Sequence, residues 1–306
     1  MRKTPSARLI PLVVDKLFYK IVLTEISHQV ATELVAKLTE AQALRLQAAW
    51  LRANEKYIKA YRRQLVRRFN EMEKDVLGNM KSAKGYKEAA FDVDAWLFNR
   101  KKWRGILTAD NKLYAAAPLE SGGKATMDSL GVDIAFDQQD PLVLEWLAAN
   151  SKNAGWSIAD TQYEALRTVL MEGAADGLSI PKLGKLVEGA MDVARKRAEL
   201  IARTEMLKAS NRGGWLAMKQ SGVVEGKQWQ ATFDKRTCPM CAEMDGATMP
   251  LDEPFFKQGD ERTFEGTTDT PAPENGITFK FDYEEVTHPP LHPDCRCTLL
   301  AIVKGV

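Results

Sequence analysis

The chain carries four cysteines, and all of them lie in two short clusters in its last seventy residues. The first cluster is Cys238–Cys241, with the pattern Cys-Pro-Met-Cys, and the second is His292–Cys297, with the pattern His-Pro-Asp-Cys-Arg-Cys. Two thiolates separated by two residues can hold one ion, and a second cluster with a histidine and two cysteines can complete a tetrahedral shell of sulfur and nitrogen. The spacing therefore predicts a zinc site.

Five side chains compete for the four positions of such a shell: Cys238, Cys241, His292, Cys295 and Cys297. In an extended segment Cys295 and Cys297 point to the same side, so both thiolates could bind the ion and leave His292 as a hydrogen-bonding neighbour. Equally, His292 and one of these two thiolates could bind it, and the sequence leaves the choice open. Because four protein ligands leave no position for an activated water, we expect a structural site.

A pair of disulfides and a set of unrelated buried thiols are the alternative interpretations of the same cysteines. Secreted proteins that depend on disulfides are usually shorter and richer in cysteine, and they carry a signal peptide. This chain has 306 residues, and its most apolar early stretch, Leu9–Val14, is followed at once by Asp15 and Lys16. We therefore expect neither a membrane span nor a secretory segment, and we favour zinc.

The first part of the chain is predicted to be helical and basic. Residues 12–78 contain almost no glycine or proline and are rich in strong helix formers. From Ile58 to Val76 apolar residues recur at steps of three and four, which gives one buried face. The opposite face carries Lys59, Arg62, Arg63, Arg67 and Arg68. A solvated face of a helical hairpin is the interpretation we prefer for these cations, and contact with DNA or a partner protein is the alternative.

The remaining segments predict an α+β fold, in which a helix-rich N-terminal region precedes helices and a small antiparallel sheet with zinc-stapled loops. Residues 81–155 are predicted to be an irregular connector, since a glycine pair and an Asp-Pro step indicate turns. Helices are expected to begin near Ser157, Ser179 and Val193, and strands are expected over 228–233, 278–283 and 297–303. The predicted domains are residues 1–155, the helical region with its connector, and residues 156–306.

Two arginines and a histidine beside the cysteine clusters receive structural interpretations. Arg236 and Arg296 are expected to neutralise the thiolates or to pair at the surface with Asp234 and Asp245. His288 is expected to be a solvent-exposed loop residue, because two prolines stiffen the chain between it and the second cluster.

Several motifs follow one another in a fixed order over the second half of the chain. On the predicted helix, Arg197-Ala198 is followed by Ile201–Glu205, with the pattern Ile-Ala-Arg-Thr-Glu. Next come Trp229, the loop Asp234–Cys241 and Asp245-Gly246, and Pro289–Cys297 comes last. Together these motifs closely resemble the phage head-morphogenesis family, the Mu F-like minor head proteins. The resemblance covers residues 157–303, about half of the chain, and family members typically have a variable, helix-rich N-terminal portion.

The resemblance implies a minor head protein of a tailed bacteriophage, with a few copies in each virion. It implies a place in the capsid interior at the portal vertex, reached by assembly in the host cytoplasm. The implied roles are procapsid assembly and DNA packaging, followed by release together with the DNA. The implied partners are the portal protein, the major capsid or scaffolding protein and the packaged DNA, and no membrane.

Two other classes of protein use similar residues, namely zinc-ribbon DNA-binding proteins and metal-dependent enzymes that process nucleic acid. A zinc ribbon has the same Cys-x-x-Cys knuckles, but acidic residues outnumber basic ones after Pro250, and phosphate would be repelled there. A zinc deaminase requires His-x-Glu and Pro-Cys-x-x-Cys, and neither pattern occurs. Arg203 and Glu205 fit a helix-face ion pair or a packing contact better than a catalytic pair. We therefore expect binding and not catalysis.

Overall fold

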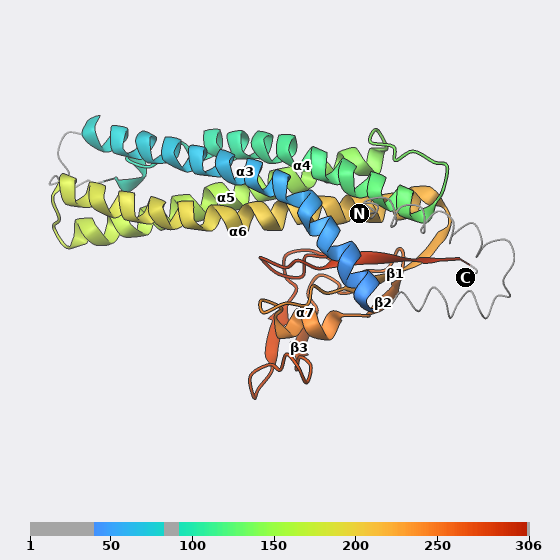
Figure 1. Cartoon of the computed structure of the whole chain (residues 1–306). Coiled ribbons are helices and arrows are strands. Elements are labelled where there is room, and N and C mark those ends of the chain that lie inside the picture. Colours follow the sequence, from blue (N-terminus) through green and yellow to red (C-terminus); the bar gives the residue numbers. More distant parts are fainter. Residues whose placement is uncertain (1–39, 83–91, 305–306) are drawn as a thin grey trace, which may run out of the picture.

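The computed structural model describes residues 40–82 and 92–304, so the part of the predicted helical region before residue 40 lies outside the described residues. Long helices dominate the described chain: α3 (Glu40–Ser82), α4 (Arg100–Leu130), α5 (Pro141–Ala175) and α6 (Ile180–Ser221). They lie side by side in an elongated bundle, and a short 3-10 turn, η1 (Val93–Ala95), precedes α4 (Figure 1). The first part of α3 leaves the bundle and crosses toward the C-terminal strands (Figure 1).

The helices form where the sequence supplies an apolar face and suitable caps. The predicted face of α3 is confirmed, because its apolar residues from Ile58 to Val76 are at most 6% exposed. Helix α4 begins at Asn99, whose side chain accepts a hydrogen bond from the Lys102 amide at 2.9 Å. Asp140 caps α5 in the same way through the amide of Leu142. None of the described helices is both long enough and apolar enough to span a membrane.

The prediction of an irregular connector over residues 81–155 is wrong for most of the residues that the structure describes there. Residues 100–130 form α4 and residues 141–155 form the first part of α5, whereas residues 83–91 lie outside the described chain. The pattern was misleading because Gly122 and Gly123 lie within α4 and do not form a turn: Gly122 makes room for α6, and Gly123 makes room for the ring of Phe136. The predicted helix start at Ser157 is also wrong, since this residue lies within α5.

Helix α6 joins two helices that the sequence analysis separated. Ser179 precedes it as the predicted first residue of a helix, but the helix continues through Val193 to Ser221 without interruption. Helix α5 likewise runs unbroken across residues 155 and 156, where a domain boundary is predicted. The division into two domains therefore stays a prediction.

Helices α4 and α6 approach each other most closely at glycines. A Cβ atom on Gly122 would lie 2.0 Å from the carbonyl oxygen of Ser210, and one on Gly213 would lie 1.9 Å from the carbonyl oxygen of Leu119. Side-chain carbons do not approach a backbone oxygen this closely. Both positions therefore require glycine, and the contact fixes α6 against the bundle.

The C-terminal part adds short strands and one short helix to the described chain. Strand β1 (Val224–Gln230) pairs antiparallel with β2 (Thr248–Pro250) on one side and with β5 (Thr298–Val303) on the other. Strands β3 (Glu261–Phe264) and β4 (Ile277–Lys280) form a second antiparallel pair, and α7 (Pro239–Met244) follows β1. The predicted α+β class is confirmed, and the three predicted strands correspond to β1, β4 and β5, whereas β2 and β3 were not predicted.

Two hydrophobic cores lie within the described chain. The larger one fills the helical bundle, and Leu299, Ala301 and Val303 of β5 pack against it. The smaller one surrounds the cysteine clusters and contains Trp229, Phe256, Phe264, Phe281 and Leu291 together with Cys241, Cys295 and Cys297. The sheet β2-β1-β5 thus joins the bundle to a small core built around the thiols.

Candidate metal centre

The pairing of β1 with β5 brings the two cysteine clusters together. Gln230, the last residue of β1, lies opposite Thr298, the first residue of β5. Because the strands are antiparallel, the chain that leaves β1 toward the first cluster starts beside the chain that enters β5 from the second. Thr232 reinforces this arrangement, since its hydroxyl donates a hydrogen bond to the carbonyl oxygen of Arg296 at 2.7 Å.

The first cluster is set by a tight turn and by the start of α7. In the turn, the amide of Arg236 donates to the carboxylate of Asp234, and the amide of Asp234 donates to the hydroxyl of Thr237. Cys238 is the N-cap of α7, and the amide of Cys241 donates to its sulfur at 3.4 Å. This geometry directs both thiols of the Cys-Pro-Met-Cys segment to one side.

Helix α6 holds the second cluster at two points. The hydroxyl of Thr204 accepts a hydrogen bond from the amide of Asp294 at 3.1 Å, and the guanidinium of Arg203 pairs with the Asp294 carboxylate. The side chain of Asn211 donates to the carbonyl oxygen of Cys297 at 3.0 Å and accepts from Thr298. The sequence does not predict these roles of Thr204 and Asn211, because the residues around a polar side chain on a long helix do not indicate a hydrogen-bond partner about ninety residues away.

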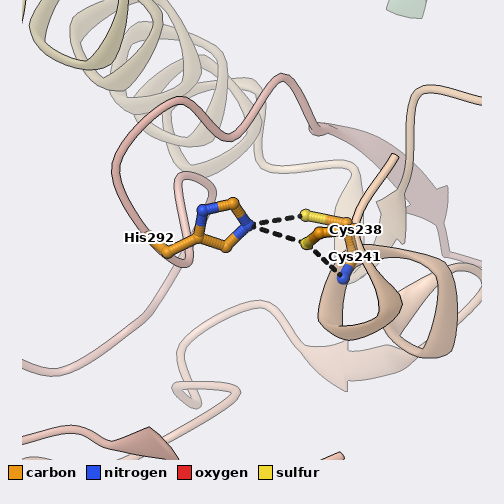
Figure 2. Close-up of side chains that lie close together, drawn as sticks. All are labelled: Cys238, Cys241 and His292. Atoms are coloured by element: carbon orange, nitrogen blue, oxygen red, sulfur yellow. Dashed lines mark hydrogen bonds between the residues drawn. The ribbon is translucent and has the colours of Figure 1, made fainter. Parts of the chain in front are cut away.

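The donor atoms of the five predicted ligands form two groups that share Cys241. Cys238, Cys241 and His292 make the first group, and Cys241, Cys295 and Cys297 make the second; within each group all donor atoms lie within 4.8 Å of one another. Figure 2 shows the first group, in which Nε2 of His292 lies 3.1 Å from the sulfurs of both Cys238 and Cys241. The structure therefore brings all five residues together, and the choice of four among them stays open.

The size and chemistry of the site fit one metal ion. The four cysteines are free thiols, and the residues around them enclose a cavity of about 20 Å³. The sulfurs of Cys241 and Cys295 are 3.7 Å apart, close to the roughly 3.8 Å between two sulfurs that bind a tetrahedral zinc. Nε2 of His292 lies nearer to its two sulfurs than the roughly 3.5 Å expected around zinc, so binding would move the ring slightly outward.

The orientation of the His292 ring also suits a ligand. Its Nδ1 lies 2.7 Å from the carbonyl oxygen of Pro293, and a proton on Nδ1 that is donated to this oxygen leaves Nε2 with a free lone pair. Metal-bound histidines commonly use their second nitrogen in this way. The ring is thus turned with its ligating nitrogen toward the thiols (Figure 2).

The thiols share protons with one another, and this sharing shifts their acidity in opposite directions. Hydrogen bonds from Cys241 and His292 lower the pKa of Cys238 to about 4, whereas the hydrogen bond to Cys238 raises the pKa of Cys241 above its ordinary value. Burial lowers the pKa of His292, but the hydrogen bond to Cys238 and the charge of Cys295 outweigh burial and bring it to about 9. A bound cation would replace these shared protons and stabilise the thiolates together.

The flanking arginines largely behave as predicted, with one correction. Arg296 binds both carboxylate oxygens of Asp234, one at 2.7 Å, and this pair holds the pKa of Asp234 well below its usual range. Arg236 lies farther from the same carboxylate, at 3.6 Å. Arg296 is 8% exposed, so the expectation of surface pairing is wrong for this residue. The carboxylate of Asp245 accepts a hydrogen bond from the amide of Ala231.

His288 is not the exposed loop residue that the sequence predicts. It is 6% exposed, its Nδ1 lies 2.7 Å from the carbonyl oxygen of Pro289, and burial lowers its pKa well below the ordinary value. Stiffness of the neighbouring prolines does not prevent the loop from folding inward against the bundle. His288 is absent from both groups of donor atoms.

Arg203 makes the predicted ion pair on the helix face, whereas Glu205 makes packing contacts with neighbouring helices. Arg203 pairs with Glu199 one turn earlier at 3.0 Å, in addition to its pair with Asp294. Glu205 accepts hydrogen bonds from Asn111 of α4 and Asn150 of α5, and burial raises the pKa of its carboxyl group. Both side chains therefore join helices or loops to one another.

The predicted basic face of α3 is partly engaged in ion pairs within the chain. Arg68 does not face solvent as predicted, because it binds both oxygens of Asp110 on α4, one at 2.6 Å. Arg62 pairs with Glu199 of α6 at 3.2 Å. Lys59, Arg63 and Arg67 remain exposed, and Lys59 pairs with Glu55 on the same helix. A contact with DNA or a partner through this face stays a prediction.

Residues 164–300 match the family described as "Phage Mu protein F like protein". They contain the end of α5, all of α6, β1 to β4, the start of β5 and both cysteine clusters. The match covers a little under half of the chain and supports the phage head-morphogenesis family, the Mu F-like proteins. Helices α3 and α4 precede the Mu F-like segment and pack against it. The resemblance inferred from the motifs is thereby confirmed.

A curated relative from Enterococcus faecalis (strain ATCC 700802 / V583) carries the name NAD(+)--arginine ADP-ribosyltransferase EFV. It is 26% identical over 140 residues, which are 45% of this chain and 25% of the relative. The chain thus matches about a quarter of the length of that protein. No solved structure matches the chain.

Proposed function

We propose that this protein is a minor head protein of a tailed bacteriophage that acts during procapsid assembly and DNA packaging. The observation that carries the proposal is the Mu F-like segment, which contains the ordered motifs and the paired cysteine clusters. We place the protein in the capsid interior near the portal vertex, in a few copies, with release together with the DNA on infection. The portal protein and the major capsid or scaffolding protein are its proposed partners, and packaged DNA is a further one.

The proposal includes one structural zinc ion at the candidate metal centre. Thiolates with an imidazole are the ligands that zinc prefers, and free thiols in a small apolar core favour it over harder cations. The ion would join two loops that are separated by about fifty residues of sequence. Its binding free energy would then contribute to folding of the small core.

We expect this protein to bind partners and not to catalyse a reaction. A shell of four protein ligands leaves no open position on the ion for a water or a substrate. Arg203 and Glu205, the two motif residues considered above as a catalytic pair, are engaged in contacts that hold the fold. The activity named for the Enterococcus relative belongs to a protein of which three quarters lie outside the match.

Localisation in the intact particle tests the proposed function. Heads would be purified from phage that carry an epitope tag on this protein, and the tag would be located by electron microscopy focused on the portal vertex. We expect the tag inside the shell at that vertex, and we expect loss of the protein to reduce the yield of DNA-filled heads. A protein absent from purified heads and bound to DNA in the host cytoplasm would contradict the proposal and favour a zinc-ribbon DNA-binding protein.

Charge reversal on α3 tests the partner contact separately. Arg63→Glu with Arg67→Glu changes two exposed cations, whereas Arg68 must be kept because it pairs with buried Asp110. We expect the doubly reversed protein to fold normally and to enter heads less efficiently, as measured by its amount per particle. If the variant enters heads in unchanged amounts and the heads contain unchanged DNA, the basic face of α3 does not contact a partner or DNA.

A further inference from the structure

Three arginines from separate segments meet at a cavity that lies beside the metal centre and contains none of its candidate ligands. Arg203 comes from α6, Arg236 from the turn before α7, and Arg296 from between two cysteines of the second cluster. They line a cavity of about 280 Å³ together with residues of α3. The cavity therefore lies between the crossing part of α3 and the loops that carry the thiols.

The cavity combines an apolar floor with a basic rim. Ile58 of α3 and Leu207 of α6 are 6% and 0% exposed, and Leu51 lies beside them, partly buried. Arg52 and Lys59 add two cations to the three arginines, and Glu55 and Glu199 supply the only carboxylates among the lining residues that the structure describes. Both carboxylates are already paired with cations, Glu55 with Lys59 and Glu199 with Arg62 and Arg203.

The cations of the rim differ in whether their charge is neutralised. Arg296 is held by Asp234 and Arg203 by Asp294 and Glu199, so these two guanidinium groups are positioned by carboxylates. Arg52 makes no ion pair with any residue that the structure describes. Arg236 has one carboxylate nearby, that of Asp234 at 3.6 Å, and 62% of the Arg236 side chain is exposed. Two arginines thus offer their donors to an external anion, one from α3 and one from the turn before α7.

We infer that this cavity binds an acidic segment of a partner protein, with an aliphatic side chain on the floor and carboxylates on Arg52 and Arg236. Planar guanidinium groups bind carboxylates through paired hydrogen bonds, and the aliphatic floor gives the complex apolar area to bury. A nucleic acid fits less well, because the lining contains no aromatic ring on which a base could stack. This binding does not depend on whether the protein acts in a phage head.

Selection from a library of random short peptides on the full-length protein tests the inference. We expect enrichment of peptides in which Asp or Glu accompanies Leu, Ile or Val, and loss of that enrichment with Arg52→Glu plus Arg236→Glu. One enriched peptide would then be synthesised, and its affinity measured by fluorescence anisotropy. We expect the double reversal to weaken binding by about tenfold or more.

Matched controls separate the cavity from general surface charge. Lys56→Glu plus Lys235→Glu changes the net charge by the same amount as the double arginine variant. Both lysines are exposed, lie on the same helix and turn as Arg52 and Arg236, and do not line the cavity. We expect this variant to bind the peptide with almost unchanged affinity. Leu51→Ala should weaken binding, whereas Leu113→Ala, at a residue 72% exposed elsewhere, should not. Thermal unfolding of each variant checks that the fold is retained.

Three results would overturn the inference. The first is the absence of any enriched peptide class, or enrichment of basic or uncharged peptides. The second is an equal loss of affinity in the two double variants, which would indicate attraction to net charge alone. The third is a single-stranded oligonucleotide that binds more tightly than the peptide and displaces it, which would make the cavity a nucleic-acid surface.

Discussion

Cys241 has a special position at the metal centre, because its sulfur belongs to both groups of donor atoms. Whichever of His292, Cys295 and Cys297 complete the shell, Cys241 lies within reach of the ion. The neighbouring residues of α7 are buried but carry no ligand in either group. This difference allows a ligand variant to be compared with a packing variant in the same short helix.

We expect Cys241→Ser to abolish zinc binding and to unfold the small core, since a hydroxyl is a poor zinc ligand and metal binding contributes to folding. Elemental analysis and thermal unfolding measure the two effects. Met244→Leu, a change of similar volume at a buried residue of the same helix, should retain the metal and cost less than about 1.5 kcal/mol. Full metal content in the serine variant would exclude Cys241 as a ligand.

A comparison of His292→Ala with Cys297→Ser resolves the composition of the shell. The Nε2 atom of His292 lies 3.1 Å from two sulfurs, and Cys297 lies in the group of buried thiols. If both cysteines of the second cluster bind the ion, the histidine variant keeps its zinc with somewhat lower affinity. If His292 binds together with Cys238, Cys241 and Cys295, the histidine variant loses zinc and Cys297→Ser keeps it. Loss of zinc in neither variant would contradict a shell drawn from these five residues.

Among the elements, α6 connects all parts of the described chain. It packs against α4 through glycines, binds the second cluster through Thr204 and Asn211, and lines the basic cavity with Arg203. Helix α4 is fixed in turn to α5 by an ion pair between Arg104 and Asp160. The packing of these helices therefore decides where the loops with the thiols lie.

Gly213→Ala tests the closest of these helix contacts. The added methyl group would meet the carbonyl oxygen of Leu119, so α4 and α6 must separate, and we expect a loss of about 3 kcal/mol or more in the free energy of unfolding. Gly189→Ala on the same helix has open space around it and should stabilise the protein by about 0.5–1 kcal/mol. Denaturant unfolding measures both variants, and equal effects would contradict the close contact.

The ion pairs of Asp160 predict how stability depends on pH. Hydrogen bonds from Arg104 and Arg100 lower the pKa of Asp160 to about 2, below its value in the unfolded chain. A lowered pKa stabilises the fold above about pH 4, and this stabilisation is lost as the pH falls toward 2. Asp160→Asn should therefore cost about 1–2 kcal/mol at neutral pH and almost nothing near pH 2. Glu172→Gln, at an exposed residue of α5, should show no such dependence.

The sequence predicted the elements whose pattern is local and missed those decided by distant contacts. The apolar stripe of α3 and the alternation in β1 and β4 could be recognised because each pattern repeats over neighbouring residues. Helix α4 was missed because Gly122 and Gly123 resemble a turn until the close approach of α6 to the first and of Phe136 to the second is known. The thiol clusters were found from spacing alone, whereas the burial of His288 depends on how a whole loop folds against the bundle.

At the scale of the whole molecule, the two cores differ in what holds them together. The larger core consists of long helices with many apolar contacts, and the sheet packs against it through β5. The smaller core has short strands and loops around the thiols, and short strands alone seldom form a stable unit. The proposed ion is therefore expected to matter for the small core and much less for the bundle.

Removal of metal by a chelator should unfold the small core and leave the bundle folded. We expect backbone amides of residues 231–297 to lose protection against hydrogen exchange, while those of α4, α5 and the first part of α6 keep it. Restoration of protection by added zinc, but not by magnesium, is the control. Equal loss of protection in both cores, or no loss in either, would contradict this division of stability.

X-ray absorption at the zinc edge of the purified full-length protein, combined with its metal content, tests the central claim most directly. We predict one zinc per chain, held by four protein ligands, with sulfur at about 2.3 Å and any nitrogen at about 2.0 Å. The spectrum should not change when a small anion is offered as a competing ligand. Protein that contains no metal, or an ion with an exchangeable oxygen ligand in its first shell, would contradict a closed structural site.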